Sequence, residues 1–279
     1  MRKLEEKIFK ALMIGATIII FSVLIYIIYV IVRKGLPSLN WDMVSKVPSG
    51  GFYLGKEGGV LNAILGSVFL IIGSIILSLS IGLPVALYIN FILRKTSKFS
   101  NIVRFSFDIL YGIPSIVYGA FGFMLMIFFG IQASLLGGIL AVSLLIIPVL
   151  VRSIDEVAAF VPRELTEATQ SLGATRYETL KVIVRQLMPG ITTAILLAVG
   201  RGIGDAATVL FTAGYTDSIP TSLTQPAATL PLAIFFQLSS PIEEVQNRAY
   251  ASALILMIII LIISFAGRYF NKKLSKSKI

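Results

Sequence analysis

Six long apolar segments, separated by shorter polar and charged ones, form the main pattern along this chain. They are Ala11–Val32, Val60–Leu93, Ile102–Phe129, Ala133–Val151, Ile191–Gly214 and Ala249–Ala266. About 20 apolar residues suffice for a helix to cross the hydrocarbon core of a bilayer, so we predict an all-α integral membrane protein with six transmembrane helices. The first segment lacks both charges and a small-residue cleavage site, which indicates a retained anchor rather than a signal peptide.

Glycine and proline indicate where these segments break. Gly112 and Pro114 interrupt the third segment, and residues 130–132 predict a tight turn before the fourth. Between the fifth and sixth segments, Leu230–Leu238 is apolar but too short to span a membrane. We interpret it as an interfacial or re-entrant helix, or as a docking surface for an external partner.

A polar segment, Glu164–Gly190, lies between the fourth and fifth apolar segments and is called the polar hairpin below. At helical period it predicts two short amphipathic helices separated by Gly173, which can adopt the left-handed conformation that ends a helix. Pro189-Gly190 indicates the start of the next apolar segment. The predicted apolar faces are Val161, Leu165, Ala168 and Leu172 in the first helix, and Tyr177, Leu180, Val184 and Leu187 in the second.

The apolar faces of such a hairpin have to be covered. One interpretation is that they dock into a groove on a soluble partner. The other is that the hairpin folds back on its own protein or lies on the lipid surface. Periodicity alone does not choose between the two.

Composition narrows the class of protein. Of the 279 residues, 56% are hydrophobic and 14% charged, and the mean hydropathy is +0.91, so lipid is the solvent for most of the chain. The sequence contains no cysteine and no histidine. Disulfides, thiolate metal sites and imidazole bases are therefore excluded, and neither a metal nor a cofactor is expected.

The net charge of +10 is better explained by membrane orientation than by binding of nucleic acid. With six spans, 18 lysines and arginines lie on the side of both termini and five on the other side, while Arg201 lies within a span. By the positive-inside rule, both termini and the polar hairpin are predicted to be cytoplasmic.

Two charged residues of opposite sign, Arg201 and Asp205, lie in the fifth apolar segment. Their i, i+4 spacing allows a pair on one helix face, and Gly200 and Gly204 would let another helix approach. One interpretation is a silent salt bridge that locks helix packing. The other is that Arg201 lines a polar pathway and meets an anion, because a guanidinium can donate two parallel hydrogen bonds to a phosphate-like oxyanion.

Two further signals are interpreted as structural. Asp108, four residues after Arg104, predicts a paired charge at the membrane interface. Gly50–Lys56 spells the start of a phosphate-binding loop, but Glu57 replaces the magnesium-binding Ser or Thr and no apolar strand precedes it. We therefore expect no nucleotide site and no catalytic residues in this chain.

The polar hairpin also resembles a known family. Glu167-Ala168-Thr169, followed after three residues by Gly173, resembles the EAA loop of ABC importer permeases, with Thr169 in place of the third alanine. The segments Gly112–Gly119 and Arg201–Ala213 resemble the third-span and fifth-span motifs of the phosphate-specific members of that family.

Two positions depart from the family pattern. The family usually has glutamate where Asp205 stands and proline where Thr208 stands. The resemblance implies substrate-pathway roles for Arg201, Gly204 and Asp205. The residues it implies for ATPase coupling are Glu167, Ala168, Thr169, Leu172 and Gly173.

The resemblance further implies the fold of a type I ABC importer permease, of the A-type phosphate subunit, in a prokaryotic plasma (inner) membrane. Residues 1–59 would form an N-terminal anchor helix and external loop. Residues 60–279 would form the transmembrane domain, with the coupling loop at about 153–190. The implied partners are a second, C-type permease in a heterodimer, two cytoplasmic ABC ATPases and an external phosphate-binding protein.

Other functions stay open at this point. Another oxyanion, such as molybdate, sulfate or phosphonate, is the first alternative. A secondary transporter that uses Arg201 and Asp205 without ATP is the second, although such carriers are usually longer and built from repeats. A membrane-embedded enzyme is the third, and the absence of histidine and cysteine argues against it.

Overall fold

The structure is a computed structural model that describes residues 2–49, 57–93 and 97–276. The loop-like motif at Gly50–Lys56 lies outside these residues. The helices are α1 (Arg2–Gly35), α2 (Trp41–Ser45), α3 (Leu61–Leu87), α4 (Lys98–Gly112), α5 (Ser115–Phe128), α6 (Leu135–Ala158), α7 (Arg163–Ser171), α8 (Arg176–Ile203), α9 (Leu230–Leu238) and α10 (Glu243–Lys276). The other elements are a 3-10 turn (Leu36–Ser38), a π-helical turn (Tyr88–Ile92) and the paired strands β1 (Pro48–Ser49) and β2 (Glu57–Gly58).

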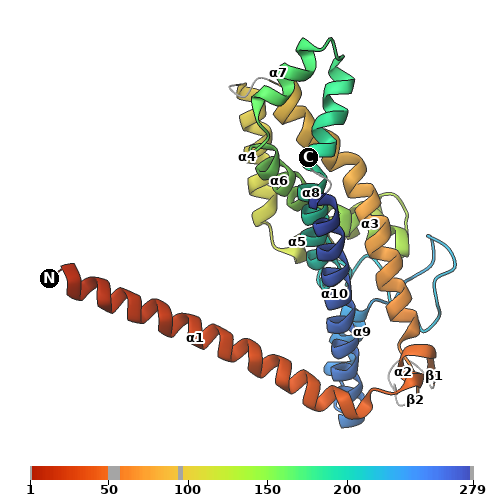
Figure 1. The fold of residues 1–279 in the computed structure, drawn as a ribbon. Coiled ribbons are helices and arrows are strands. Elements are labelled where there is room, and N and C mark those ends of the chain that lie inside the picture. The colour runs from red at the N-terminus through yellow and green to blue at the C-terminus, as the bar shows by residue number, and fades with distance from the viewer. Residues whose placement is uncertain (1, 50–56, 94–96, 277–279) are drawn as a thin grey trace.

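Helix α6 forms the core of the bundle and packs against α3 and α8 (Figure 1). Its most apolar stretch is 72% buried, more than that of any other long helix in the described part of the chain. Small residues let the neighbours approach: Gly73 of α3 faces the Ile139 side chain, and Gly202 of α8 faces Val142. The close approach places α8, which carries Arg201, directly on the core helix.

Helix α1 projects away from the bundle and meets it only at its C-terminal end (Figure 1). There, Gly35 lies against the backbone of Tyr250 on α10, and the Lys34 ammonium lies 5.0 Å from the centre of the Tyr250 ring. The apolar side chains of α1 are exposed along its length, as in Ile20 at 68%. An apolar surface on all sides is typical of a helix surrounded by lipid or by other helices.

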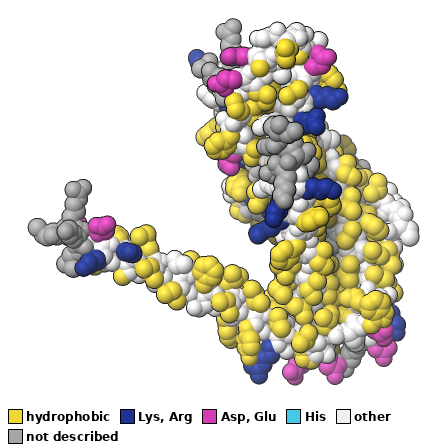
Figure 2. Space-filling view, in the orientation of Figure 1, with side chains coloured by type: hydrophobic (Ala, Val, Ile, Leu, Met, Phe, Trp, Pro, Cys, Tyr) yellow, Lys and Arg dark blue, Asp and Glu magenta, His cyan; other side chains and the backbone are white. Residues whose placement is uncertain are grey.

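Five of the described helices, α1, α3, α6, α8 and α10, are long and apolar enough to cross a membrane. A sixth span exists if α4 and α5 count together, but the chain bends by 100° between them. The predicted interruption is confirmed: α4 ends at Gly112, and Pro114 holds Ile113 in an extended conformation that no helix can continue. Charged side chains gather toward the two ends of the bundle and leave an apolar body between them (Figure 2).

The short segment Leu230–Leu238 is a helix, α9, as predicted. Its first turns are buried, and the backbone N–H of Leu230 donates a hydrogen bond of 2.8 Å to the hydroxyl of Ser67 on α3. Gly66 lies against the carbonyl of Ala228 just before the helix. The segment is therefore inserted between α3 and α10 rather than lying free on a surface.

Candidate functional site

Arg201 lies in the last turn of α8, next to the break between α4 and α5. Its guanidinium carbon lies 5.1 Å from the centre of the Tyr111 ring, near the end of α4. This is the geometry of a cation–π contact, which orients the cation without using its N–H groups. Among the described residues, the guanidinium of Arg201 makes no hydrogen bond and no ion pair.

The predicted ion pair between Arg201 and Asp205 does not form within the described chain. Helix α8 ends at Ile203, so the two residues do not share a helix face, and the predicted fifth span, which ran to Gly214, is too long. A carboxylate oxygen of Asp205 instead accepts a hydrogen bond of 2.8 Å from the backbone N–H of Thr208. Aspartate caps the start of a helical turn in this way, and here it begins a new turn after Gly204.

This second turn is attached to the α4–α5 break. The Thr208 hydroxyl donates a hydrogen bond of 3.2 Å to the carbonyl of Ser115, the first residue of α5. Gly119, one turn further along α5, lies against the carbonyls of Ala207 and Thr208. The segment that follows α8 is thus fixed to the first turns of α5.

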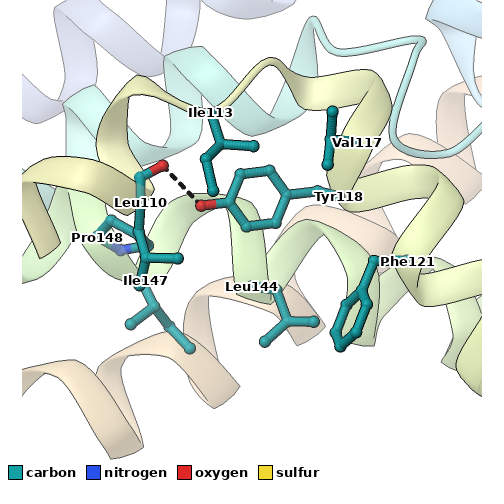
Figure 3. A pocket seen from close by; sticks show the side chains of 8 residues that line it. All are labelled: Leu110, Ile113, Val117, Tyr118, Phe121, Leu144, Ile147 and Pro148. Atoms are coloured by element: carbon teal, nitrogen blue, oxygen red, sulfur yellow. Dashed lines mark hydrogen bonds between the residues drawn. The ribbon is translucent and has the colours of Figure 1, made fainter. Parts of the chain in front are cut away.

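The break itself is bridged by Tyr118, whose hydroxyl donates a hydrogen bond of 2.7 Å to the Leu110 carbonyl of α4 (Figure 3). Around it lies a cavity of about 340 Å³, lined by Leu110, Ile113, Val117, Tyr118, Phe121, Leu144, Ile147 and Pro148. No lining side chain carries a charge, so this cavity does not suit an ion. The polar chemistry of the region therefore belongs to Arg201.

Glycines leave the surface around Arg201 open. A Cβ added at Gly112 or Gly200 would meet nothing within 4 Å, and one at Gly204 would meet only the Gly200 carbonyl. The expectation that Gly200 and Gly204 pack against another helix is therefore wrong for the helices described here. The three predicted pathway residues lie together at the end of α8, on a surface that another molecule can approach.

The polar hairpin has the predicted turn. Helix α7 ends at Ser171, and Gly173 adopts a φ of +80°, the left-handed conformation that side chains disfavour. The next helix begins with a capping box, in which Thr175 and Glu178 bond reciprocally to each other's backbone N–H groups. Thr169 faces α8, where its hydroxyl lies 3.2 Å from that of Thr179.

The predicted apolar faces of the hairpin are only half right. Val161 and Leu165 are half-buried, but Ala168 is exposed and Leu172 is 89% exposed. In the part of α8 that belongs to the hairpin, the buried residues are Thr179, Ile183 and Leu187. The packed face is therefore shifted from the predicted one, and Tyr177 is left 76% exposed. Phe160 is also exposed, at 87%. These exposed apolar residues are together called the hairpin patch below: Phe160, Ala168, Leu172 and Tyr177.

The second helix of the hairpin and the fifth span are one helix. Proline and glycine at positions 189 and 190 predicted a boundary, but α8 continues through both. The stripe formed by Ile183, Leu187 and Ile191 stays buried across this point, and Gly190 lies against Val157 of α6. Packing on α6 thus overrides the local effect of proline, and one helix runs from the hairpin to Arg201.

A buried ionic network near the end of α6 was missed by the sequence reasoning. Both carboxylate oxygens of Asp155 lie 3.1 Å from the Arg104 Nε, and one accepts a 3.0 Å hydrogen bond from Arg152. Asn90, in the π-helical turn, donates a 2.7 Å hydrogen bond to Asp155. We call this network the ionic clamp: Asn90, Arg104, Asp108, Arg152 and Asp155.

The ionic clamp corrects the pairing expected for Asp108. Its partner is Arg152 of α6, at 2.7 Å, and not Arg104 of its own helix. Arg104 is taken by Asp155, whose side chain is only 9% exposed. In the sequence, Asp155 stands three residues after Arg152 near the end of an apolar segment, and this spacing was the only hint of a pair. The second partner of Asp155, Arg104, comes from α4, and its position depends on the tertiary fold.

Comparison with known proteins decides the family. Residues 78–276 match the family described as binding-protein-dependent transport system inner membrane component. The chain belongs to this family. Among its relatives in the family, the phosphate transport system permease protein PstA of Haemophilus influenzae is 32% identical over 271 residues, which cover 96% of this chain and 94% of that protein.

Two more relatives of this chain are also phosphate transport system permease proteins. PstA of Pasteurella multocida is 31% identical over 277 residues, with 99% of this chain and 97% of that protein covered. PstA 1 of Mycobacterium tuberculosis is 36% identical over 213 residues, with 75% and 69% covered.

Solved structures agree on the fold. A chain of the MetNI methionine ABC transporter, in an inward-facing conformation, has a TM-score of 0.62 at 19% identity and covers 77% of this chain and 95% of its own. A chain of an amino acid ABC transporter, crystallised with histidines, has a TM-score of 0.52 at 17% identity, with 76% and 92% covered. The predicted fold of a type I ABC importer permease is confirmed.

Proposed function

We propose that this chain is the transmembrane permease subunit through which an ATP-driven importer moves inorganic phosphate. Its membership of the binding-protein-dependent family and its identity of 31% to 36% with three phosphate permeases support this assignment. The observation that carries it is Arg201, a cation fixed by Tyr111 on an open surface with its hydrogen-bond donors unused within the described chain.

The chemistry of Arg201 suits a tetrahedral oxyanion. A guanidinium presents five N–H groups in a planar fork, which can bond two oxygens of one phosphate at once. Asp205 adds a means of discrimination, since one of its oxygens accepts from Thr208 and carboxylates have further acceptor sites. Phosphate that keeps a proton at neutral pH can donate to such an oxygen, whereas sulfate has no proton to donate and would be repelled.

Energy for transport would enter through the polar hairpin. The hairpin patch offers aromatic and aliphatic side chains on a short helical unit, the type of surface that docks into a groove of a partner. In this proposal Glu167, Ala168 and Leu172 contact the ATPase, while Thr169 and Gly173 hold the hairpin in shape. Because α8 is continuous, movement of the hairpin would shift Arg201 directly.

The complete importer in this proposal has a second, C-type permease, two cytoplasmic ABC ATPases and an external phosphate-binding protein. Both termini and the hairpin face the cytoplasm of a prokaryotic cell, as the distribution of lysine and arginine favours. The ATPases hydrolyse ATP, and this chain contributes the pathway at residues 60–279, with residues 1–59 as anchor and external loop. The second permease is part of the proposal because one such chain cannot enclose a pathway with two-fold symmetry.

The test is ATP-dependent uptake of labelled phosphate by vesicles that contain the complete complex. The wild type is compared with Arg201→Gln, which removes the charge, and Arg201→Lys, which keeps the charge but loses the fork. We expect uptake to fall about 100-fold in Arg201→Gln and less in Arg201→Lys, with assembly and ATP hydrolysis retained.

Competitors identify the substrate. Sulfate and molybdate in excess should leave wild-type phosphate uptake unchanged and should compete in Asp205→Asn. If sulfate or molybdate is taken up in place of phosphate, the chain transports another oxyanion. If uptake proceeds without ATP, the secondary-transporter interpretation replaces the one proposed here, and normal transport by Arg201→Gln would reduce Arg201 to a packing residue.

A further inference from the structure

The ionic clamp joins three parts of the fold around the buried carboxylate of Asp155. Asn90 comes from the π-helical turn that follows α3, Arg104 and Asp108 from α4, and Arg152 and Asp155 from α6. Arg104 also donates to the hydroxyl of Ser100 at 2.8 Å and to the Asn90 amide oxygen at 3.2 Å. The side chains of the ionic clamp thus bond to one another and to their immediate neighbours.

The position of the clamp along α6 matters. Asp155 lies one turn before the end of α6 at Ala158, and α7 of the polar hairpin begins at Arg163. Movement of the hairpin can therefore reach the bundle along two routes, one through α8 and one through the segment of α6 that carries the clamp. Separating Arg104 from Asp155 would take one of its two arginine partners from a carboxylate that is only 9% exposed, so the clamp resists such movement.

Helix α4 connects the clamp to the candidate site. Arg104, Asp108 and Tyr111 have the spacing i, i+4, i+7, which places them on one face of α4. Seven residues of α-helix span about 10 Å, so the clamp lies about 10 Å along the helix from the ring that covers Arg201. Helix α4 is continuous over this distance, so it offers a packed route by which a displacement at the clamp can be passed to Tyr111.

We propose that the ionic clamp is a positioning element that ties α4 to the end of α6, so that the polar hairpin controls both members of the Tyr111–Arg201 contact. Arg201 is displaced through α8, and Tyr111 is displaced through α6, the clamp and α4. The relative position of ring and guanidinium then sets when the donors of Arg201 reach the anion. This inference rests on the proposed function, because it assigns the clamp a role in the coupling of ATP hydrolysis to transport.

The first experiment measures coupling in vesicles that contain the complete importer. Asp155→Asn removes the charge that the two arginines share, and Asp42→Asn, on an exposed ion pair with Lys46, is the matched control. We expect the ATP hydrolysed per phosphate taken up to rise about tenfold in Asp155→Asn and to stay unchanged in Asp42→Asn. A lower yield of assembled complex with an unchanged ratio would assign the clamp to stability only and overturn the proposal.

Asp108→Asn covers the case in which Asp155→Asn does not assemble. The Asp108 side chain is half-exposed, so the loss of its bond to Arg152 weakens the clamp without exposing its centre. The expected result is a smaller rise of the same ratio. The proposal is contradicted if Asp155→Asn fails to assemble and the assembled Asp108→Asn complex hydrolyses the same amount of ATP per phosphate as the wild type. The clamp would then have only a structural role.

A second experiment does not depend on phosphate. The chain has no cysteine, so Tyr111→Cys introduces a single thiol, and its reaction with a maleimide-polyethylene glycol is read as a gel shift of this subunit alone. We expect the rate of modification to differ about tenfold between the nucleotide-free complex and the complex trapped with ATP and vanadate. Adding Asp155→Asn should make the two rates equal, while the thiol of the control variant Trp41→Cys should react equally in both states.

The two experiments separate the two levels of inference. If wild-type vesicles take up no phosphate but the reaction of the thiol in Tyr111→Cys still follows nucleotide through Asp155, the clamp is retained and the substrate assignment fails. If wild-type uptake is normal and that thiol reacts at nucleotide-dependent rates even when Asp155→Asn is present, the proposed function stands and the clamp proposal is wrong.

Discussion

Two arginines of this chain occupy opposite environments. Arg104 donates to Asp155, Ser100 and Asn90, and its charge is neutralised within the bundle. Arg201 lies over the Tyr111 ring and, among the described residues, has neither a hydrogen bond nor an ion pair. Arg104 is therefore a cation that holds helices together, whereas Arg201 is one that can bind a ligand. Both are connected to the polar hairpin.

The largest expected effect tests this contrast by stability. Asp155→Asn leaves Arg104 and Arg152 without their shared carboxylate, so the free energy of unfolding should fall by about 3–5 kcal/mol, as for other broken buried pairs. Arg201→Gln removes only a cation–π contact and should cost about 0.5–1 kcal/mol. The measurement is the denaturant midpoint of the purified chain in detergent. A larger loss in Arg201→Gln than in Asp155→Asn would reverse the roles given to the two arginines.

The second prediction concerns the hairpin patch. Leu172 is 89% exposed, so Leu172→Ala should leave the stability of the chain unchanged while weakening its binding to the ATPase by about 2 kcal/mol, the scale of an interface hot spot. Affinity is measured by titration of labelled ATPase against the permease complex in nanodiscs.

Ile183→Ala is the matched control, because Ile183 is buried on α8. It should cost about 2–5 kcal/mol in stability through the cavity it leaves. If Leu172→Ala destabilises the chain as much and leaves ATPase binding intact, the patch packs on this protein instead of on a partner.

Much of the fold was predictable from the apolar segments, because segment length and the interruption at Gly112 and Pro114 are local properties. The continuity of α8 was not, since proline and glycine at positions 189 and 190 predict a boundary that burial on α6 overrides. The end of α8 at Ile203 was missed for the opposite reason: the sequence stays apolar, but Asp205 caps a separate turn.

The candidate site shows the same division. Arg201 could be singled out because a charge in an apolar segment is exceptional in any fold. The contact of Arg201 with Tyr111 and that of Asp108 with Arg152 could not be predicted, because each joins residues of different helices. Sequence spacing suggested pairs at i+4, and in both cases the fold supplied another partner.

A smaller effect is expected at the turn of the hairpin. Gly173 has a φ of +80°, so Gly173→Ala should cost about 1–2 kcal/mol of stability by placing a side chain in the left-handed region. Gly112→Ala is the control, because neither position has an atom within 4 Å of an added Cβ and Gly112 has no positive φ. Equal midpoints for the two variants in thermal unfolding would show that the turn conformation is not strained by alanine.

The smallest effect is expected at the exposed pair of Lys46 and Asp42. Its N–O distance is 2.7 Å, shorter than the 3.1 Å between Arg104 and Asp155 in the ionic clamp. The Lys46 and Asp42 side chains are 59% and 53% exposed, so water and salt screen the pair, and Asp42→Asn should cost about 0.3–0.5 kcal/mol. Unfolding midpoints at low and high salt measure this difference. If distance decided the strength of an ion pair, Asp42→Asn would be the more damaging change. If burial and the number of hydrogen bonds decide the strength of an ion pair, Asp155→Asn will be the more damaging change. High salt will then abolish the effect of Asp42→Asn but not that of Asp155→Asn.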